Sequence, residues 1–224
     1  MKTGKLFFTL LAILAPILII TTGMRVALSP LYYSLEYRLP NFPPDPYGFT
    51  RADRLRWADF SIDFISGRIG EAEFAAAQLP DGSPLFNQRE VDHMVDVRDL
   101  TSAMLWVWRG LVLLYLLAFS FTRSKQQEIS FLASLANGAK LTLALIVAVL
   151  FFLVINFNQL FTAFHRVFFE GDTWLFYNTD TLIRLFPLKF WQDLFIVIGA
   201  FSILLALFFI YLHHLRKNIA ENGN

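Results

Sequence analysis

The stretch Leu141–Phe164, LTLALIVAVLFFLVINFNQLFTAF, contains no formally charged residue. A helix needs roughly 20 apolar residues to cross the hydrocarbon core of a membrane, so this stretch is long enough to be a span. Three further stretches are similar: Leu6–Met24 and Leu194–Leu212 are uncharged, and Leu100–Thr122 is interrupted only by Arg109. The sequence therefore predicts an all-α membrane protein with four transmembrane helices.

The composition supports this class and excludes several others. Of the 224 residues, 56% are hydrophobic, which is too apolar for an ordinary soluble domain. The net charge of +1 gives no reason to expect a nucleic acid partner. The absence of cysteine excludes disulfides, thiolate metal ligands and a cysteine nucleophile. Common nucleotide-binding, zinc-protease and serine-hydrolase motifs are also missing.

Basic residues near the ends of the spans indicate the orientation. They all fall on one side of a four-span protein: Lys2, Lys5, Arg123, Lys125, Lys140, Arg216 and Lys217. Positive flanks remain in the cytoplasm, so both termini are expected there. The first span is interpreted as an uncleaved anchor. The expected order is span 1–24, extracytoplasmic loop 25–99, span 100–122, cytoplasmic loop 123–140, span 141–164, extracytoplasmic loop 165–193, and span with cytoplasmic tail 194–224.

The loop 25–99 is predicted to be mostly helical and to cap the outer face. Two capping boxes, Thr50–Asp53 and Asn87–Glu90, each predict the start of a helix. The second helix has no strong breaker before the span ends near Thr122. The other expected elements are an extended proline-rich segment, a short helix and a turn, at 39–47, 71–78 and 79–84.

Two histidines lie at the outer ends of predicted spans. His93 is on the helical extension of the second span, and His165 directly follows the third. Both imidazoles are therefore expected at similar depth near the outer membrane surface. Histidine is the side chain best suited to exchange protons near neutral pH, so this pair is the candidate catalytic centre. His213 and His214 adjoin basic residues at the cytoplasmic end and are interpreted as an interfacial flank.

A metal site is one alternative for the same histidines. Neighbouring acids could complete a ligand shell with them: Asp92, Asp96, Asp99 and Asp172. However, no pair of histidines is spaced four residues apart, and acids every three or four positions are typical of a solvated helix face. No metal ligand set is therefore predicted.

Two arginines close to the membrane are further candidates. Arg109 lies inside the second span, where a charge is costly and is often functional. It either meets a lipid phosphate or an acidic partner, or extends its side chain toward the interface. Arg166 belongs to the segment 164–174, which mixes aromatic and charged residues. Its aromatics are typical of an interfacial belt, and its charges are candidates for headgroup contacts.

Four local patterns run through the outer segments. They are Tyr47-Gly-Phe-Thr-Arg-x-x-Arg54-Leu-Arg-x-Ala, Leu85-Phe-Asn-x-Arg-Glu-x-x-His93-Met-x-Asp-Val, Phe164-His165-x-x-Phe-Phe, and Asp180-x-Leu-Ile-x-Leu-Phe-Pro followed by Phe190-Trp191-x-Asp193. The sequence resembles the bacterial lipoprotein intramolecular transacylase (Lit) family in these patterns, over nearly the whole chain. The resemblance implies transfer of the sn-2 acyl chain of a diacylglyceryl-cysteine lipoprotein to the α-amine of that cysteine, which leaves a lyso-form lipoprotein.

The resemblance also sets expectations for the site. Such a reaction needs no cofactor, because the substrate brings both nucleophile and ester. The expected partners are the lipoprotein and membrane lipid in the bacterial cytoplasmic membrane, with the protein as a monomer. His93 and His165 would be the acid and the base, in an order left open. Contacts to substrate, oxyanion or headgroup are expected from Tyr47, Arg54, Arg109, Arg166, Asp92, Asp180, Trp191 and Asp193.

Two other functions are compatible with the residues alone. The same histidines could serve a metal-dependent membrane hydrolase, in which case chelation would abolish activity. Alternatively, the chain could be a non-catalytic membrane subunit that binds a partner through the loop 25–99. Dispensable histidines would favour that second alternative.

Overall fold

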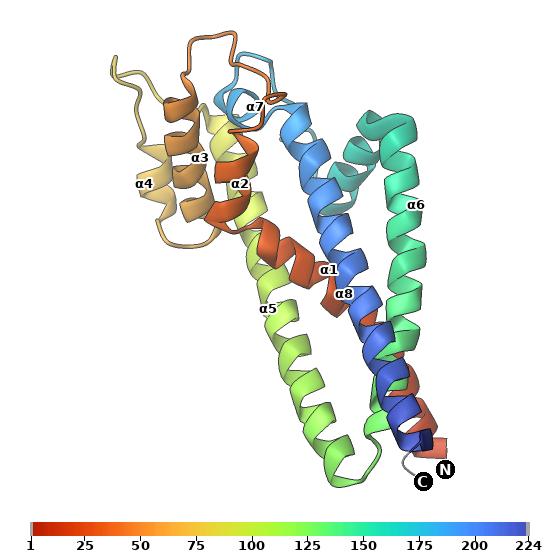
Figure 1. Ribbon diagram of the computed structural model, residues 1–224. Coiled ribbons are helices and arrows are strands. Elements are labelled where there is room, and N and C mark those ends of the chain that lie inside the picture. Colours follow the sequence, from red (N-terminus) through yellow and green to blue (C-terminus); the bar gives the residue numbers. More distant parts are fainter. Residues whose placement is uncertain (1, 223–224) are drawn as a thin grey trace. The chain divides into compact units, whose positions relative to one another are not determined.

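The computed structural model describes residues 2–222, and every regular element in that range is a helix (Figure 1). Four helices are long and apolar enough to cross a membrane: α1, α5, α6 and α8. The bounds are α1 Lys2–Ala27, α2 Pro30–Glu36, α3 Arg51–Ile65, α4 Glu71–Ala75, α5 Gln88–Ser124, α6 Glu128–Phe168, α7 Thr181–Leu185 and α8 Leu188–Asn222.

The chain divides into two compact units. The first unit contains Met1–Val26, Leu105–Phe152 and Ile196–Asn224, and the second contains Ala27–Met104 and Leu153–Phe195. The short helices and both candidate histidines belong to the second unit.

Apolar faces of the long helices pack together in the first unit. One cluster of buried residues includes Leu11, Tyr115 and Phe131. The Tyr115 hydroxyl donates a hydrogen bond to the Leu11 carbonyl, so the buried polar group is satisfied. Residues on the outside, such as Leu117 and Val147, are apolar and exposed. An apolar exterior is favourable only against lipid tails, which are as apolar as leucine.

Gly138 lies at a very close approach of α6 to α1. A Cβ atom added to Gly138 would stand 2.5 Å from the Ala12 carbonyl oxygen and would also meet the Ala15 side chain. We expect Gly138→Ala to destabilise the protein by about 1–3 kcal/mol, as overpacking does in close-packed interiors. Gly110→Ala is the matched control, because no atom of another described residue lies within 4 Å of its added Cβ, apart from its own helix and chain neighbours. Thermal unfolding in detergent measures the difference, and equal transitions would contradict this packing account.

The second unit has a core of stacked aromatic side chains. α3 contacts α2, α4 and α7, as Figure 1 also shows. Phe64 and Phe74 are fully buried, with ring centroids 4.2 Å apart, and Phe86 stacks on Phe74 at 4.5 Å. This core fixes the short helices against the first turns of α5.

Both predicted capping boxes are confirmed. Thr50 and Asp53 exchange side-chain and backbone hydrogen bonds at the start of α3. At the start of α5, the Asn87 N–H donates to the Glu90 carboxylate at 2.8 Å, and the Glu90 N–H donates to the Asn87 side chain at 3.1 Å. The second box places α5 as one continuous helix from Gln88 through Ser124.

Other local predictions need adjustment. α4 ends at Ala75, earlier than the expected end at residue 78. After this helix the Leu85 N–H donates a hydrogen bond to the Ala77 carbonyl, and residues 78 and 84 form an isolated β-bridge. The proline-rich segment 39–47 is not helical, but its first half consists of turns rather than extended chain. α6 begins at Glu128, so most of the segment 123–140 is helical.

Three structural features were not predicted. α2 begins with Pro30, a residue suited to the first helical turn, and α7 has only five residues. α6 contains a non-helical residue, Asn156, whose side chain accepts a hydrogen bond from the Gln159 N–H at 3.1 Å. Asn156 thus caps the last part of α6, which carries His165.

Candidate functional site

The two candidate histidines lie against each other inside the second unit. His93 comes from the first turns of α5, and His165 from the last turn of α6. Their ring centroids are 6.0 Å apart and the ring planes differ by 23°. His93 is 7% exposed and His165 is 6% exposed. The site is therefore a buried imidazole pair built by two helices that begin far apart in the sequence.

Hydrogen bonding distinguishes the two rings. The His165 Nδ1 atom lies 2.8 Å from the Phe161 carbonyl oxygen. A carbonyl oxygen only accepts, so Nδ1 must carry the proton. In the neutral ring this leaves the Nε2 lone pair of His165 free. The His93 Nδ1 atom is buried and has no hydrogen-bond partner within residues 2–222.

Aromatic side chains surround both imidazoles. Phe169 contacts His93 at 5.0 Å and His165 at 5.4 Å between ring centroids. Phe176 lies 5.3 Å from His93, and Trp174 lies 4.9 Å from His165. We call these three residues, together with Phe161 and Phe164 on the His165 side, the aromatic cage. Such a cage offers apolar surface to a lipid and little to a water-soluble substrate.

Asp180 connects α5 to the segment that carries the cage. Its carboxylate accepts hydrogen bonds from the Arg89 guanidinium at 2.7 Å, the Asn87 amide at 3.1 Å and the Tyr177 N–H at 2.8 Å. The Arg89 guanidinium also lies over the Phe176 ring at 5.6 Å. Asp180 therefore holds one end of the segment beside His93.

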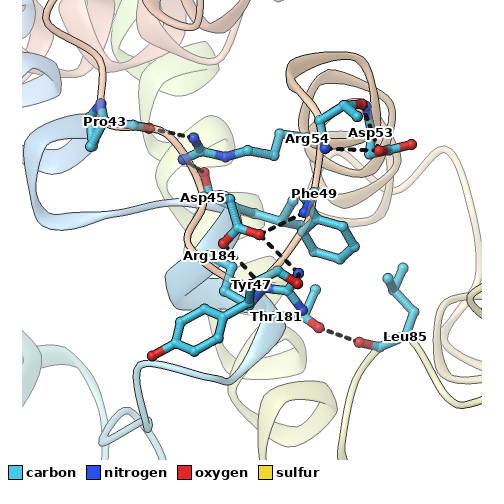
Figure 2. Close-up of polar contacts among 11 residues, drawn as sticks. Pro43, Asp45, Tyr47, Phe49, Asp53, Arg54, Leu85, Thr181 and Arg184 are labelled. Atoms are coloured by element: carbon cyan, nitrogen blue, oxygen red, sulfur yellow. Dashed lines mark hydrogen bonds and ion pairs between the residues drawn. The ribbon is translucent and has the colours of Figure 1, made fainter.

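A second polar network joins the proline-rich segment to α7 (Figure 2). Arg184 binds the Asp45 carboxylate with two hydrogen bonds, of 3.2 and 2.9 Å, and the Asp45 side chain is fully buried. Burial alone would raise the pKa of Asp45, but the hydrogen bonds from Arg184 and the Phe49 N–H hold that pKa below its usual value. Arg54 donates to the Pro43 carbonyl at 2.7 Å and lies over the Phe42 ring at 4.7 Å.

A third polar cluster lies where α2 meets the start of α8. Lys189 forms an ion pair with Asp193, and Glu36 is buried beside Asp193. Burial and the neighbouring Asp193 carboxyl raise the pKa of Glu36 to about 7. In the folded protein Glu36 therefore keeps its proton to a higher pH than an exposed glutamate does.

This raised pKa predicts a pH dependence of stability. The folded-state pKa of Glu36 is about 7, and its ordinary value is 4.5. Its stabilising contribution is therefore complete below pH about 4.5 and is lost as the pH rises to about 7. We expect the melting temperature in detergent to fall over this interval and Glu36→Gln to flatten the fall. Glu73→Gln, at an exposed position on α4, should leave the slope unchanged. An identical slope in Glu36→Gln would contradict the assignment.

The structure distributes the other predicted site residues over several places. Four of them form polar contacts within the second unit. The Tyr47 carbonyl accepts a hydrogen bond from Arg184. The other three, Arg54, Asp180 and Asp193, belong to the networks described above. The Trp191 indole donates to the Phe186 carbonyl at 3.1 Å, and its ring lies 6.0 Å from the cage residue Phe161.

The remaining three predicted residues lie outside these networks. Asp92 is exposed and bonded to Gln88 on its own helix. Arg166 is exposed on α6. Arg109 is exposed in the first unit, with its guanidinium 5.0 Å from the Trp106 ring centroid. Across residues 2–222, no group of three or more His, Asp or Glu side chains is placed to hold a metal ion.

Sequence reasoning missed the partners of these residues. Asp45 and Arg184 are 139 positions apart, and no local spacing links them. The cage residues Phe169 and Phe176 are two of 25 phenylalanines, so their type carries no signal. Glu90 was predicted only as a cap, but its carboxylate also accepts from the Leu182 N–H at 2.7 Å and ties α5 to α7.

Comparison with known proteins gives this architecture a family. The family model of the lipoprotein intramolecular transacylase Lit matches residues 9–191. The chain belongs to this family. It is accordingly an integral membrane protein with four spans and a member of a family of acyltransferases.

Individual proteins are similar to this chain over most of its length. An uncharacterized protein of Aquifex aeolicus (strain VF5) is 32% identical over 199 residues, which cover 88% of this chain and 89% of that protein. An in meso structure of Lit from Bacillus cereus superposes with a TM-score of 0.80 at 20% identity, and covers 97% of this chain and 99% of the other. A structure of the same protein with a histidine replaced by arginine gives a TM-score of 0.74 at 20% identity, over 100% and 96% of the two chains. The all-helical fold is therefore that of the Bacillus cereus transacylase.

Proposed function

We propose that this protein moves the sn-2 acyl chain of a diacylglyceryl-cysteine lipoprotein to the α-amine of the same cysteine, with His93 and His165 as the proton-transfer groups. Family membership supports the reaction class. The observation that supports the residues is the buried imidazole pair, 6.0 Å between centroids, inside the aromatic cage. Both histidines come from one chain, so we propose that a monomer is sufficient.

In the proposed mechanism the amine nitrogen attacks the sn-2 ester carbonyl carbon. His165 takes the proton of the attacking amine at Nε2, because its Nδ1 proton is held by the Phe161 carbonyl. The new C–N bond forms, and the proton taken up at His165 Nε2 passes to the unpartnered Nδ1 of His93. As the ester C–O bond breaks, His93 gives the proton on its other ring nitrogen to the departing glyceryl oxygen, so both rings end neutral.

The substrate itself supplies much of the required proximity. Amine and ester belong to one molecule, so holding the two groups in register replaces a bimolecular encounter. The aromatic cage suits this task because it offers apolar contacts to the acyl chains on both sides of the imidazoles. No metal or cofactor is required for the attack.

The acylation of lipoprotein N-termini in cells with and without this protein tests the proposed reaction. Cells with the protein should contain cysteine that is acylated on nitrogen and carries a monoacylglyceryl thioether. Cells without it should lack that species. Fragmentation mass spectrometry of N-terminal lipopeptides reports the acyl position directly. Identical fragments in both cells would contradict the proposal.

We further propose that both termini are cytoplasmic and that the histidine pair is on the extracytoplasmic side. The basic flanks of the spans support this orientation. A reporter enzyme that works only in the cytoplasm should be active when it is fused after Asn224. A reporter enzyme that works only outside the cytoplasm should be active when it is inserted in the turn at 79–84. The exterior insertion is the decisive one. A cytoplasmic result there would separate the histidines from the outer-leaflet substrate.

A further inference from the structure

The burial of the histidine pair raises a question of access. Proton transfer requires substrate atoms within hydrogen-bond reach of the imidazole nitrogens. Yet His93 and His165 are only 7% and 6% exposed. Trp174 and Phe176 cover them from the connection between α6 and α7. Some part of the cage must move before the chemistry.

The connection at 170–176 has fewer hydrogen bonds to the rest of the protein than the residues on either side of it. At one end the Phe169 N–H donates to the His165 carbonyl at 2.8 Å, and at the other Arg89 and Asn87 bind Asp180. Between these points the hydrogen bonds stay within the segment: the Trp174 indole donates to the Gly171 carbonyl and the Leu175 N–H to the Asp172 carbonyl, both at 3.1 Å. Only side-chain packing ties residues 170–176 to other described elements, which is typical of a segment that opens locally.

The exposed side of this segment mixes apolar and acidic residues, because Glu170 and Asp172 are exposed as well as Leu175. Leu175 is 48% exposed and Tyr177 is 70% exposed. Val167 and Phe168, which continue α6 directly beyond the third apolar stretch, are 75% and 50% exposed. Exposed apolar and aromatic residues beside charged ones are typical of a segment at the membrane–water interface. Because Val167 and Phe168 continue a membrane-spanning helix, the contact partner of the apolar residues is outer-leaflet hydrocarbon.

We propose that residues 170–176 form a lipid-facing lid, and that the diacylglyceryl group enters laterally from the outer leaflet and replaces Trp174 and Phe176 against the imidazoles. The acyl chains then take over the ring contacts that the lid gives up, so the apolar environment of the histidines is preserved. The Arg89–Asp180 pair acts as the latch that returns the lid. This inference rests on the proposed function, because that function supplies the lipid substrate.

The absence of cysteine makes the lid directly testable. The Thr173 hydroxyl is buried and has no hydrogen-bond partner within the described residues 2–222, so Thr173→Cys places a lone thiol under the lid. Ala76→Cys, at an exposed position on the second unit, gives the rate of open labelling, and Ser61→Cys, fully buried in α3, gives the rate of global unfolding. In nanodiscs, a soluble maleimide should label Thr173→Cys roughly tenfold or more slowly than Ala76→Cys, and faster than Ser61→Cys, as local opening requires.

A substrate analogue then separates lid opening from turnover. A synthetic diacylglyceryl lipopeptide with an acetylated α-amine keeps both chains but has no nucleophile. It should raise the labelling rate of Thr173→Cys several-fold and leave the two control rates unchanged. Asp180→Asn should raise the Thr173→Cys rate without any lipopeptide, because it removes the ion pair with Arg89.

Specific results would overturn the lid. One is labelling of Thr173→Cys as fast as Ala76→Cys in the absence of lipopeptide. Another is a rate that neither the acetylated lipopeptide nor Asp180→Asn changes while the protein still converts the free-amine lipopeptide. Loss of conversion with normal lid opening would instead contradict the proposed function and leave the lid intact.

Discussion

His93→Ala and His165→Ala should each lower the rate of acyl transfer by roughly 10²–10⁴-fold, the usual contribution of a positioned proton-transfer group. The two ring centroids are 6.0 Å apart in one aromatic cage, so each variant removes one of the two groups that transfer protons together. The double variant should be little slower than either single variant, because groups that act as a unit are strongly non-additive. Conversion of a synthetic diacylglyceryl lipopeptide by purified protein measures all three rates.

His214→Ala is the matched control for these variants. His214 is exposed on α8, far along the chain from the cage, and the proposed mechanism does not use it. Its variant should transfer acyl chains at the wild-type rate. Wild-type activity in either His93→Ala or His165→Ala would remove the paired mechanism. In that event the attacking amine would have to lose its proton without help from the missing ring.

Arg184→Ala should destabilise the protein by about 3–5 kcal/mol, as the loss of one partner of a buried ion pair does. The Asp45 side chain is fully buried, and Arg184 is its ion-pair partner within the described chain. Removing the guanidinium leaves an uncompensated carboxylate between the proline-rich segment and α7. The expected result is a large fall in melting temperature and in the amount of protein recovered from membranes.

Two controls show whether charge or packing causes this loss. Arg68→Ala removes an exposed arginine from the pair with Asp63 and should cost at most about 1 kcal/mol. Adding Asp45→Asn to Arg184→Ala removes the stranded charge and should recover part of the stability. If Arg184→Ala and Arg68→Ala have the same melting temperature, the network of Figure 2 does not hold the proline-rich segment in place.

Hydrophobic pattern and cap chemistry were sufficient to predict most of the architecture. An uncharged stretch such as Leu141–Phe164 is recognised as a span because it is long enough to cross a bilayer as a helix. The capping boxes at Thr50 and Asn87 were predicted because each is a local exchange of hydrogen bonds within four residues. These features depend on neighbours in the sequence, which is why they were visible there.

Features that depend on distant neighbours could not be predicted in this way. The kink at Asn156 and the five-residue α7 have no strong local signature. The distance between His93 and His165 depends on how α5 and α6 pack, and spacing along each helix predicted only a similar depth. The positions of Asp180 and Arg54 were indicated by family resemblance, but their partners Arg89 and Pro43 emerged from the fold.

The most direct test of the central claim is the intact mass of a diacylglyceryl lipopeptide after incubation with the purified protein. Intramolecular transfer breaks one ester and forms one amide within the same molecule, so the mass must stay constant. At the same time the α-amine must stop reacting with an amine-specific reagent, and fragmentation must place an acyl chain on the cysteine nitrogen. A product lighter by one acyl chain, with its amine still reactive, would identify a hydrolase and contradict the transacylase account.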